Sequence, residues 1–276
     1  MKYNIFVYGT LMKGMINHEY LSNSKFLGNK EVDGYKMYYL DGRPGVVRDK
    51  GIVKGELYEI DENTLRKIDM LEEYGNLYIR EEIYINSIKA YIYVYIRNID
   101  NKCVIPREMQ PFNNLVYYVS YGSNMLYERF LLYIKGDPFG ISEKSRKGCT
   151  NKCLPITSKN VIIPYDMYYG EHSKRWNGSV CFLDYSKKGY AYGRAYLITK
   201  EQFDEIKRQE GRNYRKEIKL ESIDGINAYT FTNENVLEHK SFFTVSESYK
   251  NVLIRGLSEM YPHLSIDDIN NYLIKD

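Results

Sequence analysis

Hydrophobic and polar residues alternate along several short stretches in the first half of the chain, and this period of two predicts half-buried strands. The stretches cover residues 3–8, 52–60 and 82–95, the last with a turn near Asn86 and Ser87. Between the second and third stretches, residues 61–74 have apolar side chains at helical spacing, starting from a plausible N-cap at Asp61. The first half therefore mixes strands with a helix.

The same order of elements returns in the second half of the chain. We expect strands at residues 115–120, 189–198, 214–220 and 226–232, a helix at 199–211 and helical structure over 250–275. Spacing supports a true repeat, because Gly55 precedes Glu72 by 17 positions and Gly193 precedes Glu210 by the same number. A repeat this long indicates a duplicated domain.

The predicted organisation is thus two domains. The first covers residues 1–98, a linker with two prolines covers 99–114, and the second covers 115–276. The second copy is the longer, and its extra residues are expected as an insertion at about 137–175.

Each predicted helix places a glutamate on its apolar stripe. Leu65, Ile68 and Glu72 follow one stripe, and Phe203, Ile206 and Glu210 share that spacing. A buried, unpaired carboxylate has a raised pKa, the useful state for a general acid/base. The alternative is that each glutamate reaches solvent at its helix end or pairs with Arg80 or Arg215.

A strand leads into a Tyr-Gly-hydroxyl turn in both halves, and these turns are the second candidate feature. They are the segments Tyr8-Gly9-Thr10-Leu11 and Tyr121-Gly122-Ser123-Asn124-Met125. Glycine allows close approach of the backbone, and successive backbone N–H groups with a hydroxyl can bind a carboxylate or an oxyanion. The alternative is an ordinary turn. Together with the glutamates, the turns indicate that each half has a general acid/base that faces an anion-binding turn.

Composition and charge argue against several classes of binding partner. The net charge is only +3, and no stripe of Lys and Arg favours nucleic acid. No apolar run is long enough to span a membrane, and we find no signal peptide. Cys149 and Cys153 lack a second pair of metal ligands, so we expect no metal and free thiols in the cytoplasm. We ascribe the 30 tyrosines to genome composition.

These segments resemble the gamma-glutamylcyclotransferase family, also called AIG2-like. The resemblance is carried in the first half by FVYGTLMKG, GELYEID and IDMLEEYGNLYIRE, and in the second by YGSNMLYERF, RWNG, GRAYLI and IKRQEG. It covers most of both halves and fits tandem bacterial members. It implies an α/β (α+β) fold with a small mixed β-barrel flanked by helices in each half.

The resemblance also implies an activity. The α-amine of a γ-glutamyl group attacks its own γ-carbonyl, releasing 5-oxoproline and a free amine or amino acid. Glu72 and Glu210 would be the catalytic acid/bases, and the two turns would bind the small-molecule γ-glutamyl substrate, with no cofactor. The match through the C-terminal tail favours the second half as the active one.

The chain departs from the family's usual pattern at three places, which could alter the leaving-group pocket: the residues around Glu210, then Glu73, where many members have glycine, and Asn177, where glycine is also common. The rival readings are a non-catalytic binding or regulatory module of the same fold, and a tailoring enzyme that removes a γ-glutamyl group from a natural product or amine. The sequence leaves open the leaving group, the division of labour between the halves and the oligomeric state.

Overall fold

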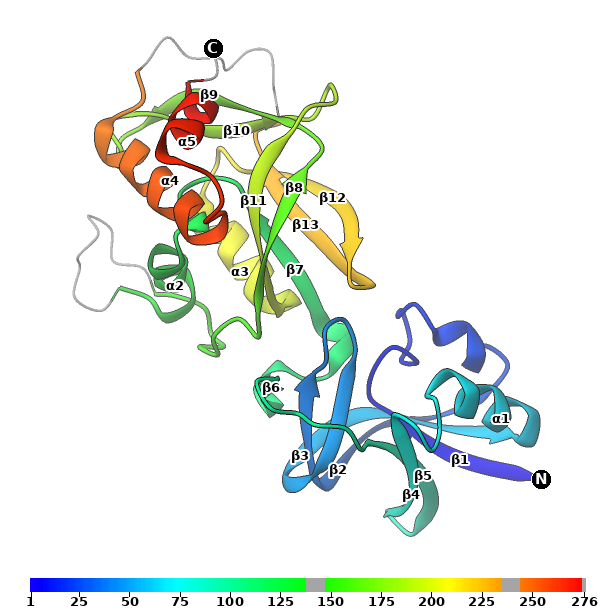
Figure 1. Cartoon of the computed structure of the whole chain (residues 1–276). Helices are drawn as coiled ribbons and strands as arrows, with labels where there is room; N and C mark the ends of the chain where they lie inside the picture. The colour runs from blue at the N-terminus through cyan, green and yellow to red at the C-terminus, as the bar shows by residue number, and fades with distance from the viewer. Residues whose placement is uncertain (138–146, 235–243, 275–276) are drawn as a thin grey trace. The chain divides into compact units, whose positions relative to one another are not determined.

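A computed structural model describes residues 1–137, 147–234 and 244–274 of the chain. These residues form two compact units with mixed α/β structure (Figure 1). The first unit comprises Met1–Leu115 and Ser222–Ile226, and the second comprises Val116–Glu221 and Asn227–Asp276. The domain boundaries expected from the sequence stay a prediction. The range expected as a linker, 99–114, contains a short strand and two short 3₁₀ helices.

A six-stranded sheet makes up most of the first unit. Its elements are β1 (Lys2–Val7), η1 (His18–Leu21), β2 (Lys25–Tyr39), β3 (Pro44–Asp61), α1 (Glu62–Leu71), β4 (Tyr78–Ile85), β5 (Ile88–Tyr95), β6 (Cys103–Ile105), η2 (Arg107–Met109) and η3 (Phe112–Asn114). The strand order is β4-β5-β1-β3-β2-β6.

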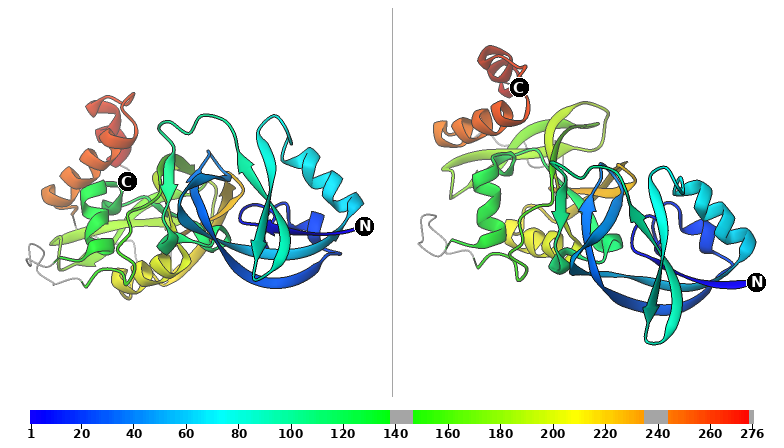
Figure 2. Two further views of the ribbon diagram at one scale, coloured as in Figure 1. Left: turned by 90° about the horizontal axis from the view of Figure 1, so that it is seen from below. Right: turned by 60° about the horizontal axis from the view of Figure 1, so that its bottom comes forward.

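Strand β1 is central to this sheet, antiparallel to β3 and parallel to β5. The long β2 and β3 pair over most of their length and curve, so the sheet forms a half-barrel (Figure 2). The curvature has a local cause, because the register of β2 against β3 shifts at Phe26/Gly28 and again at Asp33/Tyr35. Such bulges bend a strand and increase its twist.

The second unit has more elements and two sheets. They are β7 (Leu115–Ser120), η4 (Ser123–Met125), α2 (Tyr127–Lys135), β8 (Ser158–Ile163), β9 (Asp166–Ser173), β10 (Gly178–Asp184), β11 (Ala191–Thr199), α3 (Lys200–Glu210), β12 (Lys216–Ile223), β13 (Ile226–Thr232), α4 (Glu247–Met260) and α5 (Ile266–Leu273). The larger sheet has the order β12-β13-β7-β11-β8, and β9 and β10 form a separate two-stranded sheet.

The two larger sheets have corresponding strand orders. Reading from one edge, β12, β13, β7, β11 and β8 take the places of β4, β5, β1, β3 and β2. The central strand is again parallel to its neighbour on one side, since β7 pairs with β13 in parallel. A Tyr-Gly turn follows β1 and β7, and a helix follows β3 and β11.

The expectation of a second barrel is wrong, because the second sheet is not barrel-like in the described residues. The physical reason is the length of its outer strand. Strand β8 pairs with β11 through only six residues, whereas β2 is 15 residues long. The chain then leaves the sheet to form the separate β9–β10 pair, so the curvature is not continued.

The helices that carry the two glutamates begin as the sequence predicts. The Asp61 carboxylate accepts a hydrogen bond from the Thr64 N–H at 2.7 Å at the start of α1. Thr199 and Gln202 form a complete capping box at the start of α3. The expected helical structure over 250–275 is two helices, α4 and α5, because Ser265 caps a second start.

The insertion expected at about 137–175 falls partly outside the described residues, which omit 138–146. Its described part contains β8 and β9, where the sequence showed little periodicity. The core of the second unit beside it is aromatic. The rings of Phe130 and Tyr196 stack with centroids 3.9 Å apart, and Tyr118 stacks on Phe231 at 4.9 Å.

Candidate functional site

One cavity in the first unit brings together the predicted turn and the predicted glutamate. It is lined by Phe6, Val7, Tyr8, Gly9, Thr10, Leu11, Arg43, Pro44, Glu72, Tyr78 and Tyr93. Glu72 enters from the end of α1, the turn from the end of β1, and Arg43 from the turn between β2 and β3. All five first-half residues predicted for the site therefore line one cavity.

Local packing fixes the first turn. The Met12 N–H donates to the Gly9 carbonyl at 2.9 Å, and the Asn17 side chain donates to the Thr10 hydroxyl at 3.0 Å. Gly9 is required by a close approach, because a Cβ there would lie 2.5 Å from Pro44 Cγ. In the described part of the chain, the backbone N–H groups of Thr10 and Leu11 have no hydrogen-bond acceptor. The turn thus leaves donors at the cavity.

Glu72 lies at the C-cap of α1, where its N–H donates to the Ile68 carbonyl. Ile68 is fully buried, so the apolar stripe does lead to the carboxylate as expected. Among the described residues, the Glu72 carboxylate makes no hydrogen bond or ion pair. The alternative of a pair with Arg80 is wrong, since Arg80 Nε lies 3.1 Å from Asp69 Oδ1.

Burial raises the pKa of the Glu72 carboxyl to about 7, and the positive charge of Arg43 acts in the opposite direction. A carboxyl with this pKa exchanges protons near neutral pH, which suits a general acid/base. Burial also raises the pKa of Tyr8 well above its usual value, so its phenol stays neutral and donates to the Tyr93 carbonyl at 2.6 Å.

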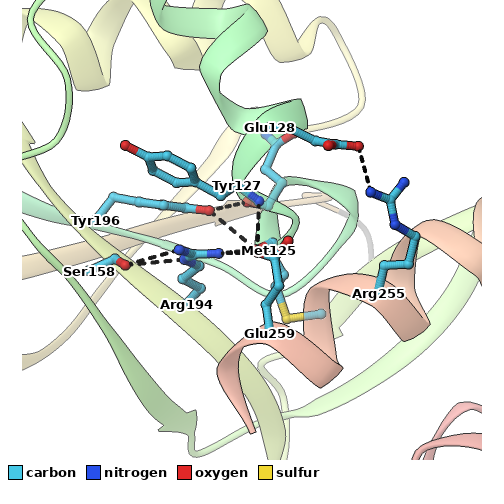
Figure 3. Close-up of polar contacts among 9 residues, drawn as sticks. Met125, Tyr127, Glu128, Ser158, Arg194, Tyr196, Arg255 and Glu259 are labelled. Atoms are coloured by element: carbon cyan, nitrogen blue, oxygen red, sulfur yellow. Dashed lines mark hydrogen bonds and ion pairs between the residues drawn. The ribbon is translucent and has the colours of Figure 1, made fainter. Parts of the chain in front are cut away.

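A matching cavity lies in the second unit. It is lined by Tyr118, Ser120, Tyr121, Gly122, Ser123, Asn124, Cys181, Glu210, Tyr214, Phe231 and Tyr249. Of the predicted second-half residues, only Met125 does not line it. The Met125 side chain is fully buried, and its carbonyl accepts a hydrogen bond from Arg194 Nη1 at 3.0 Å (Figure 3).

The second glutamate is held by neighbours, unlike the first. Asn124 Nδ2 donates to Glu210 Oε1 at 2.5 Å, and the Tyr133 hydroxyl donates to Oε2 at 2.9 Å. Asn124 occupies the place that Leu11 has in the first turn. These two hydrogen bonds fix the orientation of the Glu210 carboxylate. The alternative pair between Glu210 and Arg215 is not found in the described residues.

Several lining residues were missed by sequence reasoning. In the first cavity these are Arg43, Tyr78 and Tyr93, and in the second Tyr214 and Tyr249. No motif identifies these tyrosines. The high number of tyrosines was the available signal, because the hydroxyl of a buried tyrosine needs a hydrogen-bond partner and so tends to lie at a polar place such as a cavity. Arg43 gave no sequence signal, since the turn that carries it follows β2, which was not predicted.

The described residues contain neither a cluster of metal ligands nor a helix that could span a membrane. No group of three or more His, Cys, Asp or Glu side chains in them could hold a metal ion. None of the helices that the structure describes has the length and apolar character needed to cross a membrane.

Comparison with known proteins assigns the first unit to a family. Residues 5–111 match the family model described as gamma-glutamyl cyclotransferase, AIG2-like. The chain is similar to the gamma-glutamylcyclotransferase family protein YtfP of Escherichia coli K12, with 40% identity over 96 residues that cover 35% of this chain and 85% of YtfP.

The chain is also similar to a protein of Niallia circulans and to a crystal structure from Bacillus subtilis. The gamma-L-glutamyl-butirosin B gamma-glutamyl cyclotransferase of Niallia circulans is 38% identical over 106 residues, covering 34% of this chain and 68% of that protein. The crystal structure of YkqA from Bacillus subtilis matches 99% of this chain and 98% of its own at 19% identity, with a TM-score of 0.39.

Proposed function

The chain belongs to the gamma-glutamyl cyclotransferase, AIG2-like family, and on that premise we propose that it is a gamma-glutamylcyclotransferase. Its substrate is a small molecule with a γ-glutamyl group. The α-amine attacks the γ-carbonyl carbon, a C–N bond closes the five-membered ring of 5-oxoproline, and the bond to the leaving nitrogen breaks. The reaction is intramolecular and needs no cofactor, and the four cysteines, which form no disulfide among the described residues, are consistent with a cytoplasmic location.

The observation that carries this proposal is the state of Glu72. Its carboxylate lines a cavity beside the Tyr8-Gly9-Thr10 turn without a hydrogen-bond partner among the described residues, and its pKa is about 7. In the proposed mechanism Glu72 takes a proton from the substrate ammonium and returns it to the leaving nitrogen. A positioned carboxylate of this kind contributes typically ~10²–10⁴-fold to a rate.

The other lining groups bind and orient the substrate. The N–H groups of Thr10 and Leu11 and the guanidinium of Arg43 supply positive potential for the glutamyl carboxylate or for the developing oxyanion. Holding the amine against its own carbonyl can account for ~7–11 kcal/mol of the barrier.

A specific observation favours a different role for the second cavity. Because Asn124 and Tyr133 hold the Glu210 carboxylate, Glu210 is a fixed acceptor that suits the ammonium group of a bound γ-glutamyl ligand. The second candidate function is therefore a binding copy, with catalysis in the first unit. This reverses the preference for the second half that its tail suggested.

The proposal is tested by 5-oxoproline release from a panel of γ-glutamyl amino acids, peptides and amines. We expect Glu72→Gln to lower kcat by ~10²–10⁴ and Glu210→Gln to keep most of the activity, because Glu210 lines the other cavity. Glu73→Gln is the matched control, because it removes the adjacent exposed carboxylate. Full activity in the Glu72→Gln/Glu210→Gln double variant, or no turnover of any substrate by the wild type, would contradict the proposal.

A further inference from the structure

Arg129, on α2 of the second unit, is a buried cation that has no counter-ion among the residues the structure describes. Its exposed fraction is 8%, and its Nε is enclosed with no hydrogen-bond acceptor. Among the described residues, its guanidinium makes no hydrogen bond and no ion pair. The neighbouring acid, Glu128, pairs instead with Arg255, whose Nη2 lies 2.9 Å from Glu128 Oε1 (Figure 3).

Arg194 in the same unit shows what a satisfied buried arginine looks like. Its exposed fraction is also 8%. Its guanidinium pairs with Glu259 at 2.8 Å and donates to the Met125 carbonyl and the Ser158 hydroxyl (Figure 3). Equal burial with such different partners marks Arg129 as the exception, because removing a charge from water without compensation is costly.

The guanidinium of Arg129 packs against an indole. Its guanidinium carbon lies 4.7 Å from the ring centroid of Trp176, and that of Arg175 lies 5.7 Å from the same ring. Such cation–π contacts stabilise a cation, but they supply no negative charge. The indole therefore leaves the positive charge of Arg129 uncompensated.

A path of aromatic rings joins this place to the second cavity. Trp176 packs on Tyr249 with centroids 5.0 Å apart, and Tyr249 lines the cavity. The Tyr249 hydroxyl accepts the Cys181 N–H at 3.1 Å, and it lies 3.3 Å from where a Cβ on Gly122 would be. Two aromatic side chains in contact, Trp176 and Tyr249, therefore lie between the Arg129 guanidinium and the Tyr-Gly turn.

We propose that Arg129 binds a carboxylate on the amino-acid or peptide part of a γ-glutamyl ligand whose glutamyl group occupies the second cavity, with Trp176 packing against that part. The proposal rests on the γ-glutamyl ligand of the proposed function and adds the chemical class of the leaving group. Arginine suits this role, because its planar fork binds a carboxylate through two parallel hydrogen bonds.

The experiment uses the only tryptophan of the chain as its probe. Trp176 fluorescence is titrated with γ-glutamylalanine, with the carboxamide of the same dipeptide, and with acetate. We expect the acid to bind about tenfold or more tightly than the amide, and acetate to bind weakest. In Arg129→Gln the acid should lose its advantage, and Arg129→Lys should keep part of it. Arg255→Gln, which removes an exposed charge from the same unit, is the control.

Three results would overturn the inference. They are equal binding of acid and amide to the wild type, an undiminished preference in a folded Arg129→Gln chain, and no fluorescence response to any of the ligands. Acetate binding as tightly as γ-glutamylalanine would contradict the assignment to the leaving group. 5-Oxoproline is measured in the same samples, so an Arg129-dependent response without turnover would separate this inference from a failure of the proposed function.

Discussion

At the scale of single residues, the two glutamates have the same place in their helices and different surroundings. Glu72 has no hydrogen-bond partner in the described residues, whereas Glu210 accepts from Asn124 and Tyr133. The change of Leu11 to Asn124 between the two turns supplies one of these donors. A single substitution in a repeated motif thus supplies one of the two hydrogen bonds that hold the second carboxylate in place.

The raised pKa of Glu72 has a consequence for stability. An unfolded glutamate ionises near pH 4.5, but the folded carboxyl keeps its proton until about pH 7. Stability is therefore fully present below pH 4.5 and falls as the pH rises toward 7, by up to about 3 kcal/mol for this shift. Glutamine does not titrate, so the free energy of unfolding of Glu72→Gln should increase relative to that of the wild type between pH 4.5 and 7. This difference should persist at pH 8.

Urea denaturation of the wild type and Glu72→Gln at several pH values between 4.5 and 8 checks this expectation. Glu73→Gln is the control for a change of net charge, because its side chain is exposed on the same segment. A difference in midpoint between wild type and Glu72→Gln that does not change with pH would show that the carboxyl is not protonated preferentially in the folded state.

At the scale of elements, the sequence predicts what depends on local pattern and misses what depends on tertiary pairing. The caps at Asp61 and Thr199 and the turn at Asn86 and Ser87 were predictable, because they depend on a few neighbouring residues. Strand β2 was not, since two bulges break its alternation. Strand β10 was missed for another reason: all seven of its residues are buried, so it has no alternation.

The same distinction applies to the candidate site. The turns and the glutamates have a sequence signal, because strand ends and helical stripes are periodic. Arg43 reaches the first cavity only because β2 and β3 fold back on each other, and Tyr249 reaches the second only because α4 packs there. Such residues come from the tertiary fold, and no spacing along the chain identifies them.

Glycines at equivalent places in β3 and β11 should differ in how much they tolerate a side chain. A Cβ on Gly55 would lie 2.3 Å from the Val7 carbonyl oxygen and 2.7 Å from the Phe6 ring, so the β1–β3 pair would have to move apart. A Cβ on Gly193 would lie 3.1 Å from Val119 Cγ1, a contact that a small shift relieves. Gly55→Ala should therefore destabilise by about 1–3 kcal/mol, and Gly193→Ala by less.

The two alanine variants are compared by the midpoint of thermal unfolding, each against the wild type. Because Gly55 lies beside the strand that leads into Tyr8, Gly55→Ala should also lower 5-oxoproline release. Equal losses of stability in both variants, or a larger loss in Gly193→Ala, would contradict the packing described for β1 and β3.

At the scale of the whole molecule, the chain holds two cavities of one design, one in each unit. Each unit supplies every lining residue of its own cavity. The duplication is visible in the strand order of both sheets, although only the first forms a half-barrel. Two separate cavities allow one copy to keep the chemistry while the other becomes a binding site, which is the division proposed here.

The central claim, that Glu72 is the acid/base of a γ-glutamyl cyclisation, is tested most directly by the pH dependence of kcat/KM. It is measured for 5-oxoproline release by Glu210→Gln and by Glu72→Gln. In Glu210→Gln, kcat/KM should rise about tenfold per pH unit and level off near pH 7, where Glu72 becomes ionised. Glu72→Gln should lose most of the activity, and its remaining kcat/KM should not rise with pH below 7. The same rise with pH in Glu72→Gln, or complete loss of activity in Glu210→Gln alone, would contradict the account.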